Sequence, residues 1–442
     1  MAKHVTVLAP VSDRRTRHDA GVAMRETLPR EAHAAWAAGP ARADPLAILA
    51  AQGASRIAEL LPERTARMRA SAFAFYRGAA AVMAADLASL PHSNLIVQLG
   101  GDAHLANFGS FASPEGQAVF DVNDFDETLP GPFEWDVKRL AASFAIGGAG
   151  QGLKPGACRT LAIRAARHYR RHMARLAALS PFEAWHSAID LEHAVSTIEA
   201  PRERTLAKRR LRAAHRAHKD QYNLVEHTPS GPRLLDQGHM AHIARLQPAM
   251  DAVFEAYRDT APPHLSALFR HYRLADAAFK VVGVGSVGTF CAVGLFASGD
   301  GEVLLLQAKE AQASVLEVGL PKSAYAHQGE RVVVGQQLMQ ATPDMFLGVP
   351  PKKVDGRFFY VRRLKDSHLS AVGDVLEAAL LPFSASLCGK TLARAHARSG
   401  DAAMIAGYLG GGESFDEAIG DFAMAYAATA EADWRAFCGA GG

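Results

Sequence analysis

The sequence lacks long apolar runs, paired cysteines and an excess of one charge. No stretch reaches the roughly 18 uninterrupted apolar residues of a membrane-spanning helix, so we expect no membrane partner. The N-terminus, MAKHVTVLAPVSDRRTRHD, is too charged and too short in apolar core for a secretory signal. The four cysteines are scattered without a Cys-x-x-Cys pair, which argues against a structural zinc site and suits a reducing cytoplasm.

The charge balance argues against a nucleic-acid partner. The chain carries 48 Lys and Arg against 45 Asp and Glu, and its net charge of +3 is too small to indicate such a ligand. Because 49% of the 442 residues are hydrophobic, the chain can bury a sizeable core. At about 150 residues per domain, the length allows about three domains or one two-lobed unit with additions.

Periodicity and composition divide the chain into four segments. We expect an N-terminal arm with short helices at 1–55 and a helical lobe at 56–270, with 155–260 helical throughout. A small β-rich lobe is predicted at 271–370, and helices at 371–442 return to the large lobe. Two stretches, RAARHYRRHMARLA and RERTLAKRRLRAAHRAHK, are strongly basic. They form either solvated helix faces or an electropositive wall for an anionic substrate.

A first group of polar residues follows a short predicted strand. Asp102, His104 and Asn107 lie within six residues on a loop, and Asp124 and Asp126 follow a hairpin-like pair of strands. Converging carboxylate and amide oxygens suit Mg²⁺, especially when substrate phosphates supply further ligands. One Asp can then accept a proton from an attacking hydroxyl. The alternatives are acids that cap turns, or a calcium loop at NDFDE, which lacks the remaining ligands.

A known family shares this pattern. GDAHLANFGSFASPEGQAVFDVNDFDETLPGPFEWDVKRLAAS resembles the catalytic core of aminoglycoside and choline phosphotransferases, small-molecule kinases of the protein-kinase-like fold. Their pattern runs H-G-D-x-H-x-x-N, a hairpin, D-F-D and a D-L-x-R-L helix. The resemblance implies that Asp102 is the catalytic base, Asn107 and Asp124 bind Mg²⁺, and Asp136 braces the catalytic loop. The first His of the pattern is Gly100 here.

Further residues complete the predicted site around this loop. Asp126 is a third candidate metal ligand, and His104 is a supporting residue. Arg77, in FAFYRGAA, could meet a phosphate or Asp126, or it could pair with a core carboxylate. The basic residues that could line a nucleotide cleft are Arg331, Arg362, Arg363 and Lys365.

A second group contains the glycines of a G-x-G-x-x-G motif. Gly283, Gly285 and Gly288, with Ser286 between them, are a weak signal on their own. A dinucleotide fingerprint needs a helix at the third glycine, but TFCAVGLF predicts a strand. The motif therefore favours a strand-loop-strand cover over nucleotide phosphates, as in kinases.

A lysine follows in the next predicted strand. Lys309, in LLLQAKEA, lies among apolar residues, which favours contact with an anion over an exposed position on an edge strand. It resembles the kinase lysine that holds the α- and β-phosphates. A following helix should offer it a carboxylate, and Glu317 and Glu330 are the candidates.

The order of these parts is rotated relative to ordinary kinases, because the glycine motif follows the catalytic loop. CGKTLARAHARSGD resembles the helix that lies before the catalytic loop in the phosphotransferases. Phe279–Asp401 therefore corresponds to the first half of a kinase and Leu95–Ser143 to the second. The implied fold is α+β, protein-kinase-like, two-lobed and circularly permuted, with a helical large lobe and a small antiparallel-sheet lobe.

Stretches over nearly the whole chain resemble a bacterial family called domain of unknown function 2252. They are RMRASAFAFYRGAA, GGDAHLANFG, NDFDETLPGPFEWDVKRLAAS, VVGVGSVGTFC, LLLQAKEA, GERVVVGQQLMQ, YVRRLKD and LARAHARSGD. That resemblance implies no activity, so the functional prediction comes from the two groups. We predict an ATP- and Mg²⁺-dependent phosphotransferase for a hydroxyl acceptor, either a small molecule or a protein. The alternatives are a catalytically silent nucleotide-binding regulator and an AMP-transferring enzyme.

Overall fold

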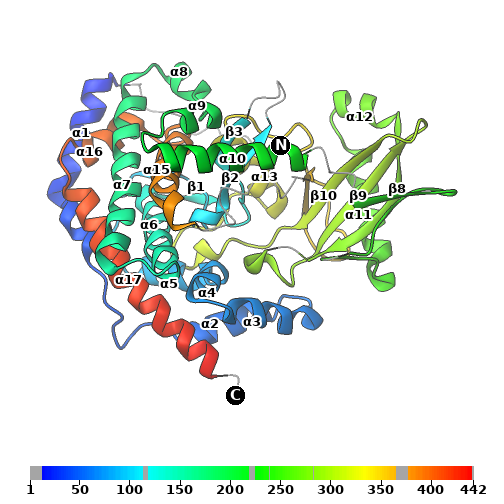
Figure 1. Ribbon diagram of the computed structural model, residues 1–442, viewed down its shortest axis with the longest axis horizontal. Coiled ribbons are helices and arrows are strands. Elements are labelled where there is room, and N and C mark those ends of the chain that lie inside the picture. Colours follow the sequence, from blue (N-terminus) through cyan, green and yellow to red (C-terminus); the bar gives the residue numbers. More distant parts are fainter. Residues whose placement is uncertain are drawn as a thin grey trace.

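The structure, a computed structural model, describes residues 12–112, 118–218, 224–237, 239–281, 283–364 and 377–440. It has the predicted mixed α+β class, with a helical body on one side and a β-rich part on the other (Figure 1). The predicted antiparallel sheet is confirmed. Within the described ranges, no helix combines the length and apolar content needed to cross a membrane.

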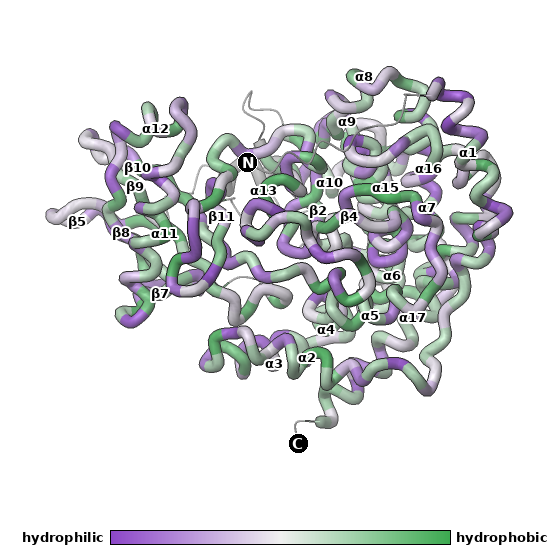
Figure 2. Tube along the Cα trace, turned by 180° about the vertical axis from the view of Figure 1, so that it is seen from behind, coloured by the Kyte–Doolittle hydropathy of each residue, from purple (hydrophilic) through white to green (hydrophobic). Residues whose placement is uncertain are grey.

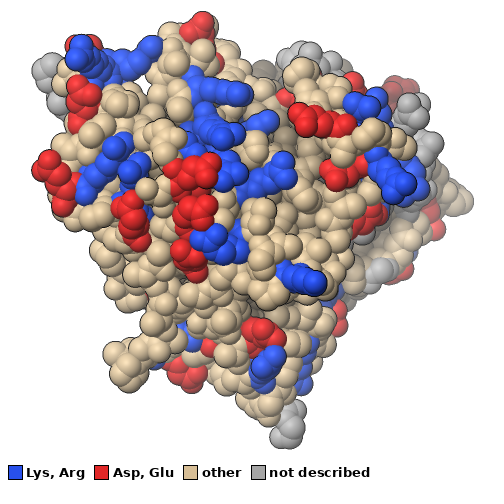
Figure 3. Space-filling view, turned by 60° about the vertical axis from the view of Figure 1, so that its left-hand side comes forward, with Lys and Arg blue, Asp and Glu red and all other residues tan. Residues whose placement is uncertain are grey.

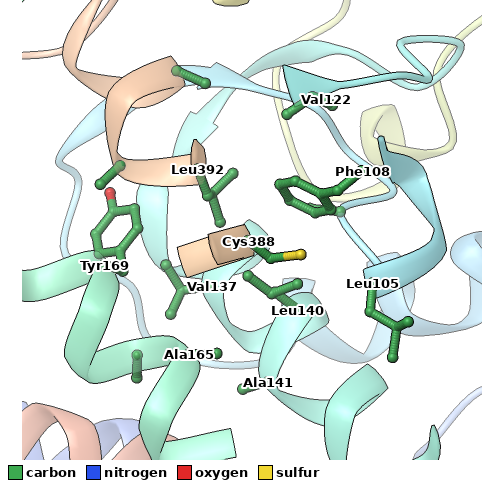
Figure 4. Close-up of a cluster of buried hydrophobic side chains, with 14 of the residues drawn as sticks. Leu105, Phe108, Val122, Val137, Leu140, Ala141, Ala165, Tyr169, Cys388 and Leu392 are labelled. Carbon is green, nitrogen blue, oxygen red and sulfur yellow. The ribbon is translucent and has the colours of Figure 1, made fainter. Parts of the chain in front are cut away.

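The helical body is built around α6, whose residues from Phe133 to Gly148 are all buried. Helices α7, α15 and α17 pack around it. Val137 and Leu140 of α6 belong to the same buried cluster as Leu392 of α15 (Figure 4). The helices of this body are α5 (Ala80–Ala88), α6 (Phe133–Gly150), α7 (Pro155–Ala178), α15 (Leu381–Ala397), α16 (Ala402–Leu409) and α17 (Ser414–Gly439).

The described part of the N-terminal arm contains short helices, as predicted. Helix α1 lies along α16, and side chains at Gly21 and Gly407 would collide with the backbones of Met404 and His18. Only glycine therefore allows the two helices to approach so closely. The elements of this region are α1 (Arg14–Thr27), η1 (Arg30–Ala34), α2 (Pro45–Gly53), η2 (Ala58–Leu60), α3 (Leu61–Arg69) and α4 (Ala72–Gly78). Figure 2 shows a green, hydrophobic tube along α5, whose Val82, Met83 and Leu87 are buried.

The β-rich part contains a five-stranded antiparallel sheet in the order β11-β10-β9-β8-β7. Strands β9 and β10 pair in antiparallel register and are joined by the short sequence SGDG. Phe254 of α11 packs against this sheet, so closely that a side chain at Gly294 of β9 would lie 2.8 Å from its ring. The strands and covering helices are β7 (Met240–Ala241), β8 (Tyr272–Lys280), β9 (Cys291–Ser298), β10 (Val303–Glu310), β11 (Phe359–Arg363), α11 (Gln247–Asp259) and α12 (Pro263–Phe269).

Two-stranded antiparallel sheets supply the remaining strands. Two of them, β1 (Ile96–Leu99) with β4 (Leu129–Pro132) and β2 (Phe108–Ala112) with β3 (Ala118–Val122), frame the predicted catalytic loop and metal segment. The expectation that 155–260 is helical throughout is wrong. Strands β5 (Val225–Thr228) and β6 (Gly231–Leu234) form a hairpin there, because Thr-Pro-Ser-Gly-Pro favours a turn. The other elements are η3 (Leu105–Asn107), α8 (Pro181–His186), α9 (Leu191–Ser196), α10 (Pro201–His218), η5 (Ala244–Leu246), η6 (Val284–Ser286), η7 (Val315–Val318), α13 (Gln328–Met339) and η8 (Ala378–Leu380).

Some of the arginines of α7 form ion pairs with the neighbouring helix. Arg159 forms ion pairs with Glu417 and Asp421 of α17, and Arg170 pairs with Asp416. Figure 3 shows basic and acidic side chains lying next to each other on the face that it presents. Arg159 and Arg170 are therefore neutralised by acidic residues of α17.

Candidate functional site

A cavity of about 310 Å³ brings the two predicted groups together. Its walls come from the loops after β1 and β3, from the glycine loop between β8 and β9, and from β10 and β11. The predicted site residues that line it are Arg77, Asp102, His104, Asn107, Asp124, Asp126, Gly283, Gly285, Ser286 and Lys309. Arg362 also lines it, whereas Lys365 falls outside the described residues.

An ion pair joins the sheet to the helical body inside this cavity. Lys309 lies in β10 between Cys291 of β9 and Tyr360 of β11, and its residue is only 3% exposed. It is therefore not on an exposed edge strand. Its Nζ lies 2.6 Å from Oδ2 of Asp126 and 3.4 Å from Oδ1 of Asp124. Burial alone would lower the pKa of Lys309, but these carboxylates raise it well above its usual value, so the ammonium stays charged.

Asp126 is the main counter-ion of this lysine. Its carboxylate accepts a hydrogen bond from Lys309. It also accepts hydrogen bonds from the Tyr360 hydroxyl at 2.6 Å and from Ser286 Oγ at 3.3 Å. Both of its oxygens are thus engaged by protein groups. As a metal ligand Asp126 would have to give up part of this network, which distinguishes it from Asp124.

The expectation that Glu317 or Glu330 pairs with Lys309 is wrong. Glu317 lies in η7 and accepts a hydrogen bond from the Ser323 amide at 3.1 Å, and it does not line the cavity. Glu330 is exposed on α13. A carboxylate from the loop after β3 already occupies the place next to the ammonium, a contact that depends on how the two parts of the molecule pack.

The carboxylate of Asp102 is held on one side only. Arg139 of α6 donates from Nε at 2.8 Å and from Nη2 at 2.6 Å, both to Oδ1. Burial raises the pKa of Asp102, and the charge of Arg139 opposes that shift. Oδ2 lies 3.7 Å from His104 Nε2, outside hydrogen-bond distance. Burial lowers the pKa of His104 well below its usual value, so this imidazole is neutral near pH 7.

Asp136 lies directly beneath the loop that carries Asp102. Its two oxygens accept hydrogen bonds from the backbone amides of Gly100 at 2.7 Å and Gly101 at 3.0 Å. His396 Nε2 lies 3.1 Å from the same carboxylate. Gly101 has a φ of +82°, and a side chain there would collide with the Glu127 carbonyl, so the loop requires glycine at this turn.

Asn107 and Asp124 have oxygen atoms left over for a ligand. The Asn107 side chain donates to the Asp102 carbonyl at 2.8 Å, and within the described ranges its amide oxygen accepts no hydrogen bond. Burial would raise the pKa of Asp124, but Lys309 and Arg362 lower it below its usual range. No three His, Cys, Asp or Glu side chains of the described chain converge as a metal site. One carboxylate and one amide oxygen nonetheless suit Mg²⁺ that takes further oxygens from phosphates and water.

Glu127 is a functional candidate to which sequence reasoning gave no such role, whereas Arg331 was predicted to line the cleft and is not among the residues that line the cavity. Glu127 lines the cavity. Burial raises its pKa to about 7, although the hydrogen bond that it accepts from the Val315 amide at 2.7 Å acts to lower this pKa. Arg331 of α13 is buried and donates to the carbonyls of Asp126 and Thr128. The crowding of acids in DVNDFDE is the sequence signal that could have singled out Glu127.

The glycine loop is held from outside by the segment after α2. The Ile57 amide donates to the Gly288 carbonyl at 2.8 Å, and Arg56 Nη1 donates to the Val287 carbonyl at 2.5 Å. Gly288 packs against Arg56 and is not among the residues lining the cavity. Strand β9 begins shortly after Gly288, so the helix required by a dinucleotide fingerprint does not follow.

Comparison with known proteins assigns the chain to a family. A sequence profile described as "Uncharacterized protein conserved in bacteria (DUF2252)" matches residues 56–440. The chain belongs to the DUF2252 family. The resemblance noted in the sequence is thereby confirmed for the family. We found no match to the chain among curated proteins or among solved structures. The site of this DUF2252 protein must therefore be interpreted from its own chemistry.

Proposed function

We propose that the protein is an ATP- and Mg²⁺-dependent phosphotransferase with a circularly permuted kinase-like fold. The observation that carries this proposal is the ion pair between Lys309 and the Asp124–Asp126 segment, in a cavity that also contains Asp102 and the glycine loop. A base, metal-binding oxygens, a buried ammonium and a backbone cover are the parts that phosphoryl transfer requires.

The order of elements in the sheet supports the kinase-like interpretation. Strand β8, the glycine loop, β9, the lysine-bearing β10 and then α13 follow one another as in the nucleotide-binding part of a kinase. The catalytic loop, which follows these elements in an ordinary kinase, precedes them here. Because α15 packs against β1 and β3, the end of the chain returns to the segment that carries this loop. Because of this packing, the elements can follow one another in a rotated order along the chain and still form a single site.

Each residue then has a defined role in the transfer. Lys309 and the glycine-loop amides bind the phosphates of ATP, and Asp102 accepts the proton of the acceptor hydroxyl through its free Oδ2. The acceptor oxygen forms a bond to the γ-phosphorus, the bond from that phosphorus to the β,γ-bridging oxygen breaks, and ADP leaves with the bonding electron pair. Arg139 keeps Asp102 oriented, and His104 stays neutral beside it. Bound through Asn107 and Asp124, Mg²⁺ would neutralise phosphate charge.

Calorimetric titration of the purified protein with ATP, with and without Mg²⁺, tests nucleotide binding. Wild-type protein that binds neither ATP nor ADP would contradict the proposal. Mass spectrometry of ATP incubated with the protein and metabolite pools separates the remaining outcomes. ADP with a phosphorylated product supports phosphotransfer, an AMP adduct indicates AMP transfer, and bound but unchanged ATP indicates a silent regulator.

Two variants test the assigned roles. Asp102→Asn should lower turnover by about 10²- to 10⁴-fold, because the base is lost, and should leave ATP affinity nearly unchanged. Lys309→Met should also abolish turnover, because the phosphates lose their cation. The matched controls are Asp300→Asn in the exposed β9–β10 turn and Lys322→Met on the surface. Folded Asp102→Asn protein that no longer binds ATP would contradict the role given to Asp102.

A further inference from the structure

Arg77 stands out among the basic residues of the cavity. It lies near the end of α4 and lines the cavity next to the glycine loop. A Cβ added at Gly283 would lie 3.7 Å from its Nη2, and one added at Gly285 would lie 3.4 Å from its carbonyl oxygen. The guanidinium is thus on the side of the loop that faces the proposed phosphate site.

The charge of Arg77 has no partner in the described part of the chain. Its Nε is buried without a hydrogen bond, and the predicted pairing with a core carboxylate or with Asp126 is absent within those ranges. Its neighbours differ, since Arg139 binds Asp102 and Arg362 donates to Gln307. A guanidinium that lines a cavity, with its buried Nε unpaired and no ion pair to a described residue, is available to an anionic ligand.

Electrostatics indicate which part of a ligand this cation would meet. After burial, Arg77 is the largest influence that lowers the pKa of His104, and it also acts on Asp102. The guanidinium therefore lies near the proposed base as well as beside Gly283. In phosphoryl transfer, the group between the phosphate-covering loop and the base is the γ-phosphate.

We infer that Arg77 binds the γ-phosphate of ATP and neutralises the charge on its oxygens during transfer. This inference rests on the proposed phosphotransferase function. Lys309 meets the inner phosphates from the sheet, and Arg77 meets the terminal one from α4. Its planar guanidinium can donate two parallel hydrogen bonds to non-bridging phosphate oxygens while the γ-phosphorus exchanges its bridging oxygen for the acceptor oxygen.

Paired titrations with ATP and ADP in the presence of Mg²⁺ test this assignment. Arg77→Gln should weaken ATP binding by roughly ten- to a hundredfold, as expected for loss of a charged hydrogen-bond pair. ADP affinity should stay within about twofold of wild type, because ADP lacks the group that Arg77 binds. Arg77→Lys should restore part of the ATP affinity, because a lysine keeps the positive charge but lacks the planar pair of N–H donors of the guanidinium. The control is Arg273→Gln, an exposed arginine of β8.

The outcomes separate this inference from the proposed function. Equal loss of ATP and ADP affinity in folded Arg77→Gln protein would overturn the inference, because Arg77 would then act on the inner phosphates or on the loop. Unchanged affinity for both would overturn it as well. If Arg77→Gln does not fold, the same comparison in Arg77→Lys decides. Wild-type protein that binds neither nucleotide would remove the proposed function itself.

Discussion

At the scale of single residues, two buried groups show how the interior treats charge. Arg394 and Asp121 are both fully buried and paired, and Arg394 also donates to the Met339 carbonyl at 2.6 Å. His33 is the opposite case, because it is buried next to the Tyr408 hydroxyl and the charge of Lys138, which acts on it, is cationic. Burial of these groups makes stability depend on pH and on single substitutions.

His33 should make the protein less stable in mild acid. Burial lowers its pKa to about 3, whereas an unfolded histidine has a pKa near 6.5. The unfolded chain therefore binds the proton more readily, and stability from this residue is lost as the pH falls from about 6.5 towards 3, at up to about 1.4 kcal/mol per unit. Urea unfolding of wild type and His33→Gln at several pH values should give a flatter pH dependence for the variant. Exposed His264→Gln should leave that dependence unchanged.

Asp136 should be required for the loop that carries the proposed base. Asp136→Ala removes the acceptor of two backbone hydrogen bonds and leaves the amides of Gly100 and Gly101 without partners. We expect the free energy of unfolding to fall by about 2–4 kcal/mol, measured by urea denaturation. A loss no larger than that of Asp300→Ala on the surface would contradict this role.

At the scale of elements, helix α15 connects the helical body to the strand before the metal segment. Arg394 extends from α15 to Asp121 of β3, and His396 extends from the same helix to Asp136 of α6. One face of α15 thus fixes the two elements that position Asp124 and Asp102. Its burial is consistent with this role, since most of its residues from Leu387 to His396 are inaccessible to solvent.

Removing the arginine of this connection should be strongly destabilising. Arg394→Met removes Arg394 as the counter-ion of the buried Asp121 carboxylate, which costs about 3–5 kcal/mol. Adding Asp121→Asn should recover part of the loss, because the buried negative charge that faced Arg394 disappears. Urea unfolding of the two single variants and the double variant gives this coupling. Strictly additive losses would show that the pair is not coupled.

At the scale of the whole molecule, the proposed site lies where the sheet and the helical body meet. Ligand binding there should stabilise both parts at once, by about 2.7 kcal/mol at a hundredfold excess over the dissociation constant. Hydrogen exchange with ATP and Mg²⁺ should therefore slow in the glycine loop at 283–289 and, together with it, in the segments 100–107 and 123–127. Protection of the glycine loop alone would contradict a single shared site.

Local patterns predicted the elements well, and the contacts between them less well. The stretches TFCAVGLF and LLLQAKEA indicated β9 and β10, and the strand predicted after Gly288 is present as β9. The partner of Lys309 was missed because Asp126 lies 183 positions away, and only packing brings them together. The β5–β6 hairpin was missed because helical residues on both sides dominated the pattern. The role of Arg139 was missed because a guanidinium in a helix does not reveal which carboxylate it reaches.

The contact between α1 and α16 gives this protein a particular weakness. Two glycines allow the backbones to touch, so one extra methyl group at Gly21 or Gly407 would force the helices apart along their length. The displaced N-terminal helix would become a substrate for proteases while the distant sheet stayed intact. Loss of that helix would expose the apolar side of α16, and aggregation, rather than loss of chemistry, would be the first sign of damage at this contact.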